Sequence, residues 1–331
     1  MVQGHPTGLF KVRHRNLPGA RTSLTHGGRF LAAVLLCSAL AACSGGPSGG
    51  TSGGESTSGA SFSPPSEVVT SPFDPAGATS ANDASIDTSH VSQGYVAAEA
   101  TGTSRLKLEV STGDTKYYYD LPNDGTPIAA PINMGNGSYL FRVMRNTTGN
   151  QYVEILATKA DVQLENDFDP YLRPNVFVNY GPDSACVAKA RELTQGAANK
   201  GDAVKAICEF VVQNVSYDYD KAKQLENAKG YVPDPDETLS TGKGICFDYA
   251  SLGAAMLRSQ GIPAQVVTGN VSPNDIYHAW IMVNIDGTWK SAQFSVDQNT
   301  WSRVDLTFAA TSGDDQSLVG DGDTYTTRYT Y

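Results

Sequence analysis

The stretch Gly244-Ile245-Cys246-Phe247-Asp248-Tyr249-Ala250 is the part of the chain from which the fold is predicted. A loop rich in Gly and Thr, residues 241–244, precedes it, and Gly261 and Pro263 end the pattern that follows. Between them, residues recur at helical spacing: Tyr249, Leu252, Gly253, Met256 and Leu257. Cys246 is therefore expected in the first turn of a helix, where free backbone N–H groups and the helix dipole favour a thiolate.

A histidine and an aspartate follow this helix on predicted strands. Apolar residues predict one strand over 264–268 and another over 281–285, with His278 leading into the second. Asp286-Gly287 is a two-residue hairpin signal, so residues 289–296 are expected to return antiparallel beside that strand. Asp305 falls in a later stretch, 301–308, that is also predicted as a strand. This order suits a cysteine nucleophile, its base and an orienting carboxylate.

These residues resemble the motifs of the transglutaminase-like superfamily, which read Gly-x-Cys-x-Asp-Tyr-Ala, His-Ala-Trp and Trp-x-x-x-Asp-Pro-Thr. Here they correspond to 244–250, 278–280 and 301–307, with Leu306 in place of the proline. The resemblance implies an α+β fold with a papain-like transglutaminase core, in which helices pack on an antiparallel sheet. It assigns Cys246, His278 and Asp305 as the catalytic residues.

Two further site assignments depend on the same resemblance. Compact relatives place the acid soon after the first hairpin, where this chain offers Gln293 and Asp297. Asp305 is preferred because a tryptophan precedes it at the family's spacing. A tyrosine near the cleft of relatives corresponds to Tyr217, for which a cleft or oxyanion role and simple packing are equal alternatives.

The first 89 residues are expected to lie outside any domain. Residues 1–42 are basic and then apolar, and they end in Leu40-Ala41-Ala42-Cys43, which resembles a bacterial lipoprotein signal peptide with Cys43 as the lipidated residue. An ordinary cleaved signal peptide is the alternative. Residues 43–89 are rich in Gly, Ser and Thr and predict a disordered tether. The chain is thus expected to be extracytoplasmic and lipid-anchored to the cell membrane.

The remainder divides into two predicted domains. Residues 90–168 show short alternating strands separated by turn signals, which predicts a small all-β, sandwich-like domain. Residues 169–331 form the transglutaminase-like domain, and two amphipathic helices, 184–195 and 202–215, should pack behind the nucleophile helix. The net charge is −10, and removal of five basic leader residues takes it to −15, which argues against a nucleic-acid partner.

Cysteine and histidine usage supports this interpretation. Cys186 and Cys208 are expected either to form a disulfide or to be buried free thiols, while Cys246 is the remaining, reactive thiol. His278 is predicted to be the only histidine of the folded part, with His90 counted in the tether. One histidine and scattered cysteines supply no zinc-ligand spacing, so neither a metal nor another cofactor is expected.

The sequence therefore predicts a membrane-anchored cysteine enzyme that attacks an amide of a protein or peptide substrate. Transfer of the acyl group to an amine (acyltransferase) and to water (protease or hydrolase) are left open, as is the oligomeric state. The alternative is a non-catalytic cell-surface binding module with a degenerate transglutaminase-like domain.

Overall fold

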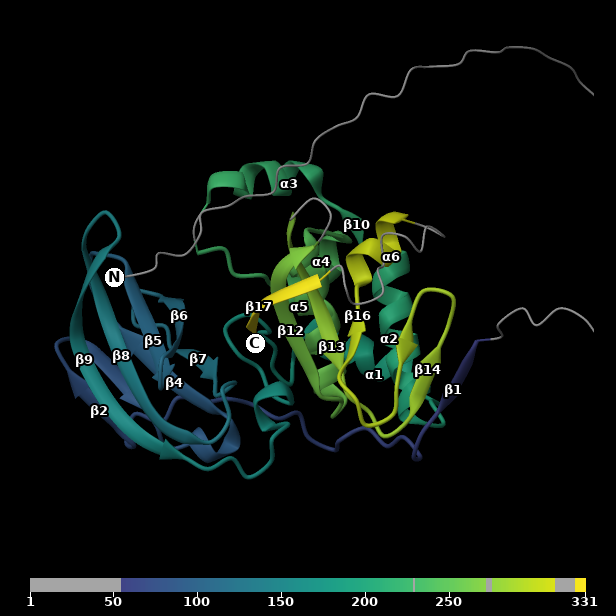
Figure 1. Ribbon diagram of the computed structural model, residues 1–331, viewed down its shortest axis with the longest axis horizontal. Coiled ribbons are helices and arrows are strands. Elements are labelled where there is room, and N and C mark those ends of the chain that lie inside the picture. Colours follow the sequence, from purple (N-terminus) through teal and green to yellow (C-terminus); the bar gives the residue numbers. More distant parts are fainter. Residues whose placement is uncertain (1–54, 229, 272–275, 313–324) are drawn as a thin grey trace, which may run out of the picture.

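The computed structural model describes residues 55–228, 230–271, 276–312 and 325–331. The predicted signal peptide, the Cys43 lipidation site and the first part of the predicted tether lie outside these residues. The described chain forms two units side by side, one made of strands and one of helices around a sheet (Figure 1).

The N-terminal unit consists of two four-stranded antiparallel sheets, which confirms the expected all-β fold. Their orders are β2-β3-β4-β7 and β6-β5-β8-β9. Alternate residues such as Leu108, Val110 and Phe141 are buried in the core of this unit. The strands are β2 (Ala78–Ala81), β3 (Ala84–Asp87), β4 (Tyr95–Ala100), β5 (Leu106–Thr112), β6 (Thr115–Leu121), β7 (Ile128–Pro131), β8 (Gly137–Thr148) and β9 (Gln151–Val162).

The prediction of a disordered tether is wrong from Glu55 onward. The strand β1 (Ser56–Ser58) pairs with β14 (Thr288–Lys290) of the C-terminal unit, and β2 and β3 belong to the N-terminal sheet. The segment between β1 and β2 runs along the base of the molecule from one unit to the other (Figure 1). The prediction from composition failed because this polar segment is ordered by backbone hydrogen bonds to other strands. It does not depend on burying apolar side chains of its own.

The C-terminal unit is built on an antiparallel sheet of order β16-β13-β12-β17. Its strands are β12 (Ala264–Val271), β13 (Ile276–Val283), β16 (Ser302–Val304) and β17 (Tyr325–Thr330). The predicted return of residues 289–296 beside β13 is wrong: β16 takes that place, and β14 pairs with β1 and with β15 (Ser295–Val296). Gly287 allows this departure, since a Cβ there would lie 1.9 Å from the Ser58 carbonyl oxygen.

The helix α5 (Cys246–Ser259) packs against β12 and β13, and α1 and α2 pack against α5 as predicted. Among the described residues, no helix is long and apolar enough to cross a bilayer. The other helices and short elements are α1 (Ala185–Thr194), α2 (Lys200–Asn214), α3 (Tyr219–Gln224), α4 (Pro235–Thr241), α6 (Leu306–Ser312), β10 (Ser216–Tyr217), β11 (Lys243–Gly244), η1 (Val91–Gln93), η2 (Asp169–Tyr171) and η3 (Leu225–Asn227).

An aromatic cluster joins the two units. Tyr331, at the end of β17, has its ring 4.6 Å from that of Phe177 and 6.2 Å from that of Tyr119 on β6. Tyr117 on the same strand meets Tyr331 edge to face at 5.9 Å. The buried residues of both units consequently form one continuous core.

Candidate active site

The loop before Cys246 is shaped by two glycines. Gly242 ends α4 in the left-handed conformation, with φ of 61°. Gly244 pairs with Tyr217 through β11 and β10, and a Cβ at Gly244 would lie 2.6 Å from the Cβ of Asp248. The close approach lets the chain turn directly into α5, so Cys246 is the first residue of that helix, as predicted. Its side chain is buried, being 1% exposed.

Asp248 fixes the start of α5. Its Oδ2 accepts a hydrogen bond of 2.8 Å from the N–H of Ile245, which satisfies one of the free donors at the helix start. The same fully buried carboxylate forms a 2.9 Å ion pair with Lys221 of α3 and accepts a hydrogen bond from the Tyr231 hydroxyl. The segment between α3 and α4 is thereby fastened to the turn that carries Cys246.

His278 and Asp305 lie in contact. His278, on β13, places Nε2 2.7 Å from Oδ2 of Asp305, and both residues are buried. The ring of Phe308 stacks on the imidazole with 4.3 Å between centroids and 10° between planes. Nδ1 is then the ring nitrogen that is not bonded to Asp305, and Cys246 is close enough to contribute to the raised pKa of the imidazole. The structure thus brings together the three residues that the sequence singles out.

Asp305 lies at a helix start rather than on a strand, which corrects the sequence expectation. It follows β16 directly and caps α6: Oδ1 accepts from the N–H of Phe308 at 3.0 Å. Leu306 is the first residue of α6, a position at which proline is common, so the proline of the family pattern and this leucine suit the same backbone. Leu306 packs on Gly253 of α5, where a Cβ would lie 2.5 Å from its Cδ1.

The charges around His278 favour its protonated form. Burial alone would lower the pKa of the imidazole, but the charge and hydrogen bond of Asp305, with a further contribution from Cys246, raise it from 6.5 to about 10. The arrangement can therefore hold a thiolate beside an imidazolium and supply a proton at Nδ1.

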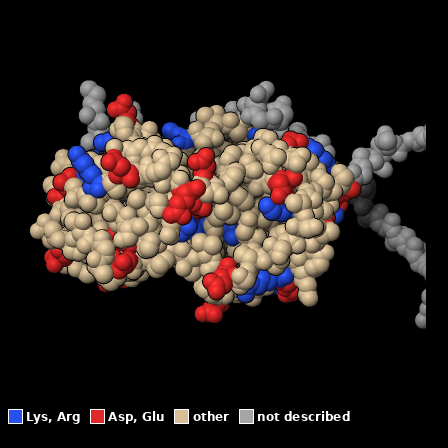
Figure 2. All heavy atoms as spheres, turned by 90° about the horizontal axis from the view of Figure 1, so that it is seen from below, with Lys and Arg blue, Asp and Glu red and all other residues tan. Residues whose placement is uncertain are grey.

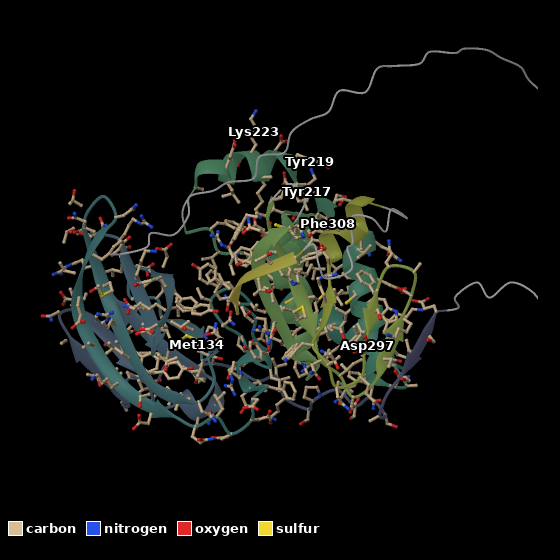
Figure 3. The ribbon with its side chains drawn as sticks, viewed as in Figure 1. Met134, Tyr217, Tyr219, Lys223, Asp297 and Phe308 are labelled. Atoms are coloured by element: carbon tan, nitrogen blue, oxygen red, sulfur yellow. The ribbon has the colours of Figure 1, made fainter. Side chains whose placement is uncertain are left out.

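Tyr217 lies near the same centre. The negative charge of Cys246 is one cause, after burial, that raises the pKa of the Tyr217 hydroxyl. Its ring meets that of Tyr219 edge to face at 4.9 Å, and Tyr219 is 60% exposed. Figure 3 shows Tyr217, Tyr219 and Phe308 at the same end of the C-terminal unit.

The two residues considered as alternatives to Asp305 have other partners. Asp297 is exposed, forms an ion pair with Lys290, and lies far from Phe308 in Figure 3. Gln293 directs Nε2 to the carbonyl oxygen of Ala309 at 3.5 Å. Of the three candidates, Asp305 is the one that the structure places in hydrogen-bonding contact with His278.

The remaining cysteines and the second histidine have other surroundings. Cys186 and Cys208 are free and buried, and burial raises the pKa of both thiols. His278 is not the only histidine of the fold, because His90 stacks on Tyr95 at 5.2 Å in the N-terminal unit. Across the described residues, no group of three or more His, Cys, Asp or Glu is placed to hold a metal ion.

Sequence reasoning missed Tyr325, whose hydroxyl donates to Oδ2 of Asp305 at 2.9 Å. The residue belongs to the predicted final aromatic strand, and no motif in the sequence connects it to the site. Only the pairing of β17 with β12, next to β13, brings it there.

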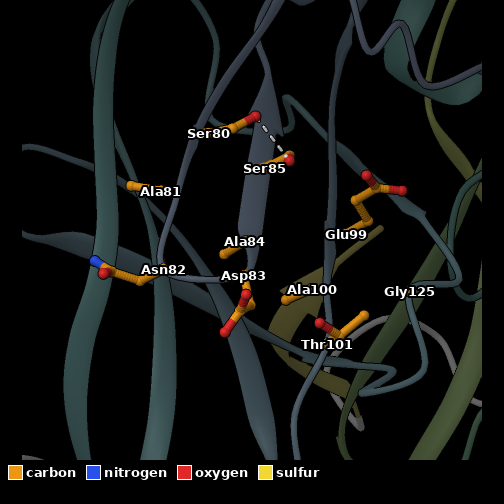
Figure 4. Close-up of a pocket in the computed structure, with 10 residues that line it drawn as sticks. All are labelled: Ser80, Ala81, Asn82, Asp83, Ala84, Ser85, Glu99, Ala100, Thr101 and Gly125. Carbon is orange, nitrogen blue, oxygen red and sulfur yellow. Dashed lines mark hydrogen bonds between the residues drawn. The ribbon is translucent and has the colours of Figure 1, made fainter.

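Surface features outside this centre are less specific. A hollow of about 480 Å³ in the N-terminal unit is lined by polar residues of the β2–β3 turn and by Glu99 and Thr101 (Figure 4). On the described part of the face in Figure 2, acidic and basic side chains are scattered among uncharged ones, without a continuous basic patch.

Comparison with known proteins agrees with this geometry. Residues 187–306, about a third of the chain, match the sequence model of the transglutaminase-like superfamily. The UPF0252 protein of Methanocaldococcus jannaschii is 36% identical over 111 residues, which are 31% of this chain and 30% of that protein. The UPF0252 protein of Archaeoglobus fulgidus is 31% identical over 126 residues, 34% of this chain and 39% of that protein.

Two solved structures match the chain at low identity and low TM-score. A protein of Cytophaga hutchinsonii named as a candidate cysteine protease is 14% identical, with a TM-score of 0.31, and covers 72% of this chain and 91% of its own. A TGase is 21% identical, also with a TM-score of 0.31, and covers 42% of this chain and 33% of its own. The chain thus contains a transglutaminase-like core domain, in which the three candidate residues are found.

Proposed function

We propose that this protein is a cysteine enzyme that transfers the acyl group of a protein or peptide amide to its own thiol. The observation that carries the proposal is the His278–Asp305 contact, with Cys246 at the start of α5 close enough to contribute to the raised pKa of the imidazole. A transglutaminase-like core over residues 187–306 is consistent with it.

The residues have distinct roles in this reaction. The Cys246 thiolate attacks the amide carbonyl carbon and forms a C–S bond, while the carbonyl oxygen takes up the electron pair of the C=O bond. The N–H of Cys246, at a helix start, is one donor to this oxyanion. His278 gives its proton to the nitrogen as the C–N bond breaks, which releases an amine and leaves a thioester. Asp305 holds the imidazole and supports its charge.

Breakdown of the thioester determines whether the product is hydrolysed or cross-linked. Neutral His278 then removes a proton from water or from an amine, and that nucleophile displaces the thiolate, which restores the ion pair. Water gives peptidase or amidase activity, and an amine gives transglutamination. Both outcomes use the same three residues, so they are separated by product analysis rather than by the site.

We further propose that the enzyme acts outside the cytoplasm and is attached to the membrane by a lipid anchor at Cys43. The motif Leu40-Ala41-Ala42-Cys43 supports this location. Because β1 begins at Ser56, 12 residues lie between the anchor and this strand, and the 13 steps from Cys43 to Ser56 span at most about 45 Å. The catalytic unit would thus work close to the membrane.

Thiol reactivity tests the enzyme proposal. A full-length chain carrying Cys37→Ser and Cys43→Ser is treated with iodoacetamide over a range of pH, and the alkylated cysteine is identified by mass spectrometry. Cys246 should react at pH 6, where an ordinary thiol of pKa about 8.5 is almost wholly protonated. Cys186 and Cys208 serve as internal controls because burial raises the pKa of each.

The comparison variant is His278→Gln, in which the alkylation of Cys246 at pH 6 should disappear. If Cys246 reacts no faster than Cys186 and Cys208 in the parent chain, the enzyme proposal fails. The non-catalytic binding module would then be the better interpretation. Cys246, which is only 1% exposed, would in that case be an ordinary buried thiol.

A further inference from the structure

The carboxylate of Asp305 receives three hydrogen bonds from protein donors. His278 Nε2 lies 2.7 Å and the Tyr325 hydroxyl 2.9 Å from Oδ2, and the N–H of Phe308 lies 3.0 Å from Oδ1. Two of the three donors therefore share one oxygen. The shared oxygen means that the strength of the bond to His278 depends on the second donor, Tyr325.

The Tyr325 ring is fixed by contacts on several sides. The guanidinium of Arg303, on β16, lies 3.8 Å from the ring centroid, and Trp280, on β13, meets the ring edge to face at 5.0 Å. Phe308, the residue stacked on His278, is 6.5 Å away. These contacts hold the phenol in place before any substrate arrives, so its hydroxyl is preorganised toward Asp305.

Tyr325 remains a donor over the working pH range. Burial and the charge of Asp305 both raise the pKa of its hydroxyl, and the cation of Arg303 offsets only part of this. The phenol therefore does not ionise beside the carboxylate.

We propose that Tyr325 is a positioning residue that sets the orientation of Asp305 and moderates the basicity of His278. Its hydroxyl takes part of the charge on Oδ2, so the imidazolium is held less firmly than by an unshared carboxylate. An imidazolium held too firmly is a poor general acid, because it releases its proton to the leaving amine less readily. This inference rests on the proposed cysteine chemistry and adds a fourth residue to it.

The charged and titratable groups around the imidazole come from four elements. Cys246 approaches from α5 and Asp305 from the start of α6, while Tyr325 on β17 bonds to Asp305 and Arg303 on β16 lies over the Tyr325 ring. In Tyr325→Phe every charge and every ring stays, and only the hydroxyl is lost. A change in the titration of His278 in this variant therefore reports the hydroxyl.

The test is the titration of the His278 ring protons by NMR in the full-length chain, with His278→Gln used for assignment. Tyr325→Phe should raise the pKa of His278 by about 0.5 to 1, since a hydrogen bond to a charged group is lost. Deprotonation of His278 should also change the rate at which Cys246 reacts with iodoacetamide at alkaline pH. The midpoint of that change should move upward by the same amount. The matched control is Tyr139→Phe, which removes a buried hydroxyl bonded to the Gly135 carbonyl in the other unit.

An unchanged or lowered pKa of His278 in a folded Tyr325→Phe chain would overturn the proposal. Circular dichroism and thermal unfolding establish that the variant is folded, and retention of the ring makes this the expected result. If instead Cys246 is unreactive in every chain, the proposed enzyme function fails, but the titration of His278 still decides the role of Tyr325.

Discussion

Replacement of Asp305 by Asn separates the two tasks of this residue. The amide oxygen of Asn can still accept from the N–H of Phe308, and Asn caps helices as well as Asp does, so α6 should start normally. The negative charge beside His278 is lost. Burial would then lower the pKa of the imidazole from about 10 toward 6.5, with Cys246 still opposing it, a fall of up to about 3.5, worth up to about 5 kcal/mol.

This fall has a measurable size at a single pH. At pH 8 a group of pKa 10 is almost fully protonated, whereas a group of pKa 6.5 is protonated in about 3% of molecules, a thirty-fold difference. Titration of the His278 ring by NMR measures it directly. Asp297→Asn is the matched control, because that carboxylate is exposed and paired with Lys290.

Protein stability gives an independent measure. The pKa of His278 is raised in the folded state, so its contribution is complete below pH 6.5 and disappears as the pH rises through about 10. The difference in unfolding free energy between the parent chain and Asp305→Asn should shrink over this window, by up to about 1.4 kcal/mol per pH unit. The reasoning would be refuted if His278 titrated in Asp305→Asn as it does in the parent chain and if the two chains showed the same pH dependence of stability.

Two further changes probe the packing around the site. Gly253→Ala places a methyl group 2.5 Å from Leu306 Cδ1 and should lower the unfolding free energy by about 1–3 kcal/mol in urea titrations, with partial recovery in Gly253→Ala/Leu306→Ala. A Gly253→Ala chain as stable as the parent would contradict the close α5–α6 contact. Lys221→Gln leaves the buried carboxylate of Asp248 without its cation and should cost about 1–3 kcal/mol. Equal stability of Lys221→Gln and Lys223→Gln, the latter a change on the same helix, would show that the ion pair contributes nothing.

Much of the site was predictable because its signals are local. The Gly-x-Cys start of a helix and the run of strand residues around His278 lie within short stretches of sequence, and the structure places both as expected. Asp305 was chosen by its spacing from Trp301, and the structure places it against His278, although the Trp301 ring packs on Tyr171 at 5.4 Å. Local spacing identified the residue without explaining its neighbours.

The features that were missed depend on pairing between distant segments. The strand at Ser56–Ser58 has no apolar pattern and exists because β14 offers it a partner more than two hundred residues away. The hairpin predicted at Asp286-Gly287 was wrong for the same reason, since the chain after it pairs with β1 instead of β13. Tyr325 reaches Asp305 only through the order of strands in the sheet. No local pattern encodes such an order.

The aromatic cluster of Tyr117, Tyr119, Phe177 and Tyr331 has a consequence for how the chain can be divided. Cutting between the two units would expose these rings to water on both fragments, and contiguous apolar surface of this kind favours aggregation. Loss of the all-β unit would also leave β17, which carries Tyr325, without the surface that its last residue packs against. The strand unit is therefore a structural part of the transglutaminase-like domain, and we expect that it cannot be removed or exchanged like an independent module.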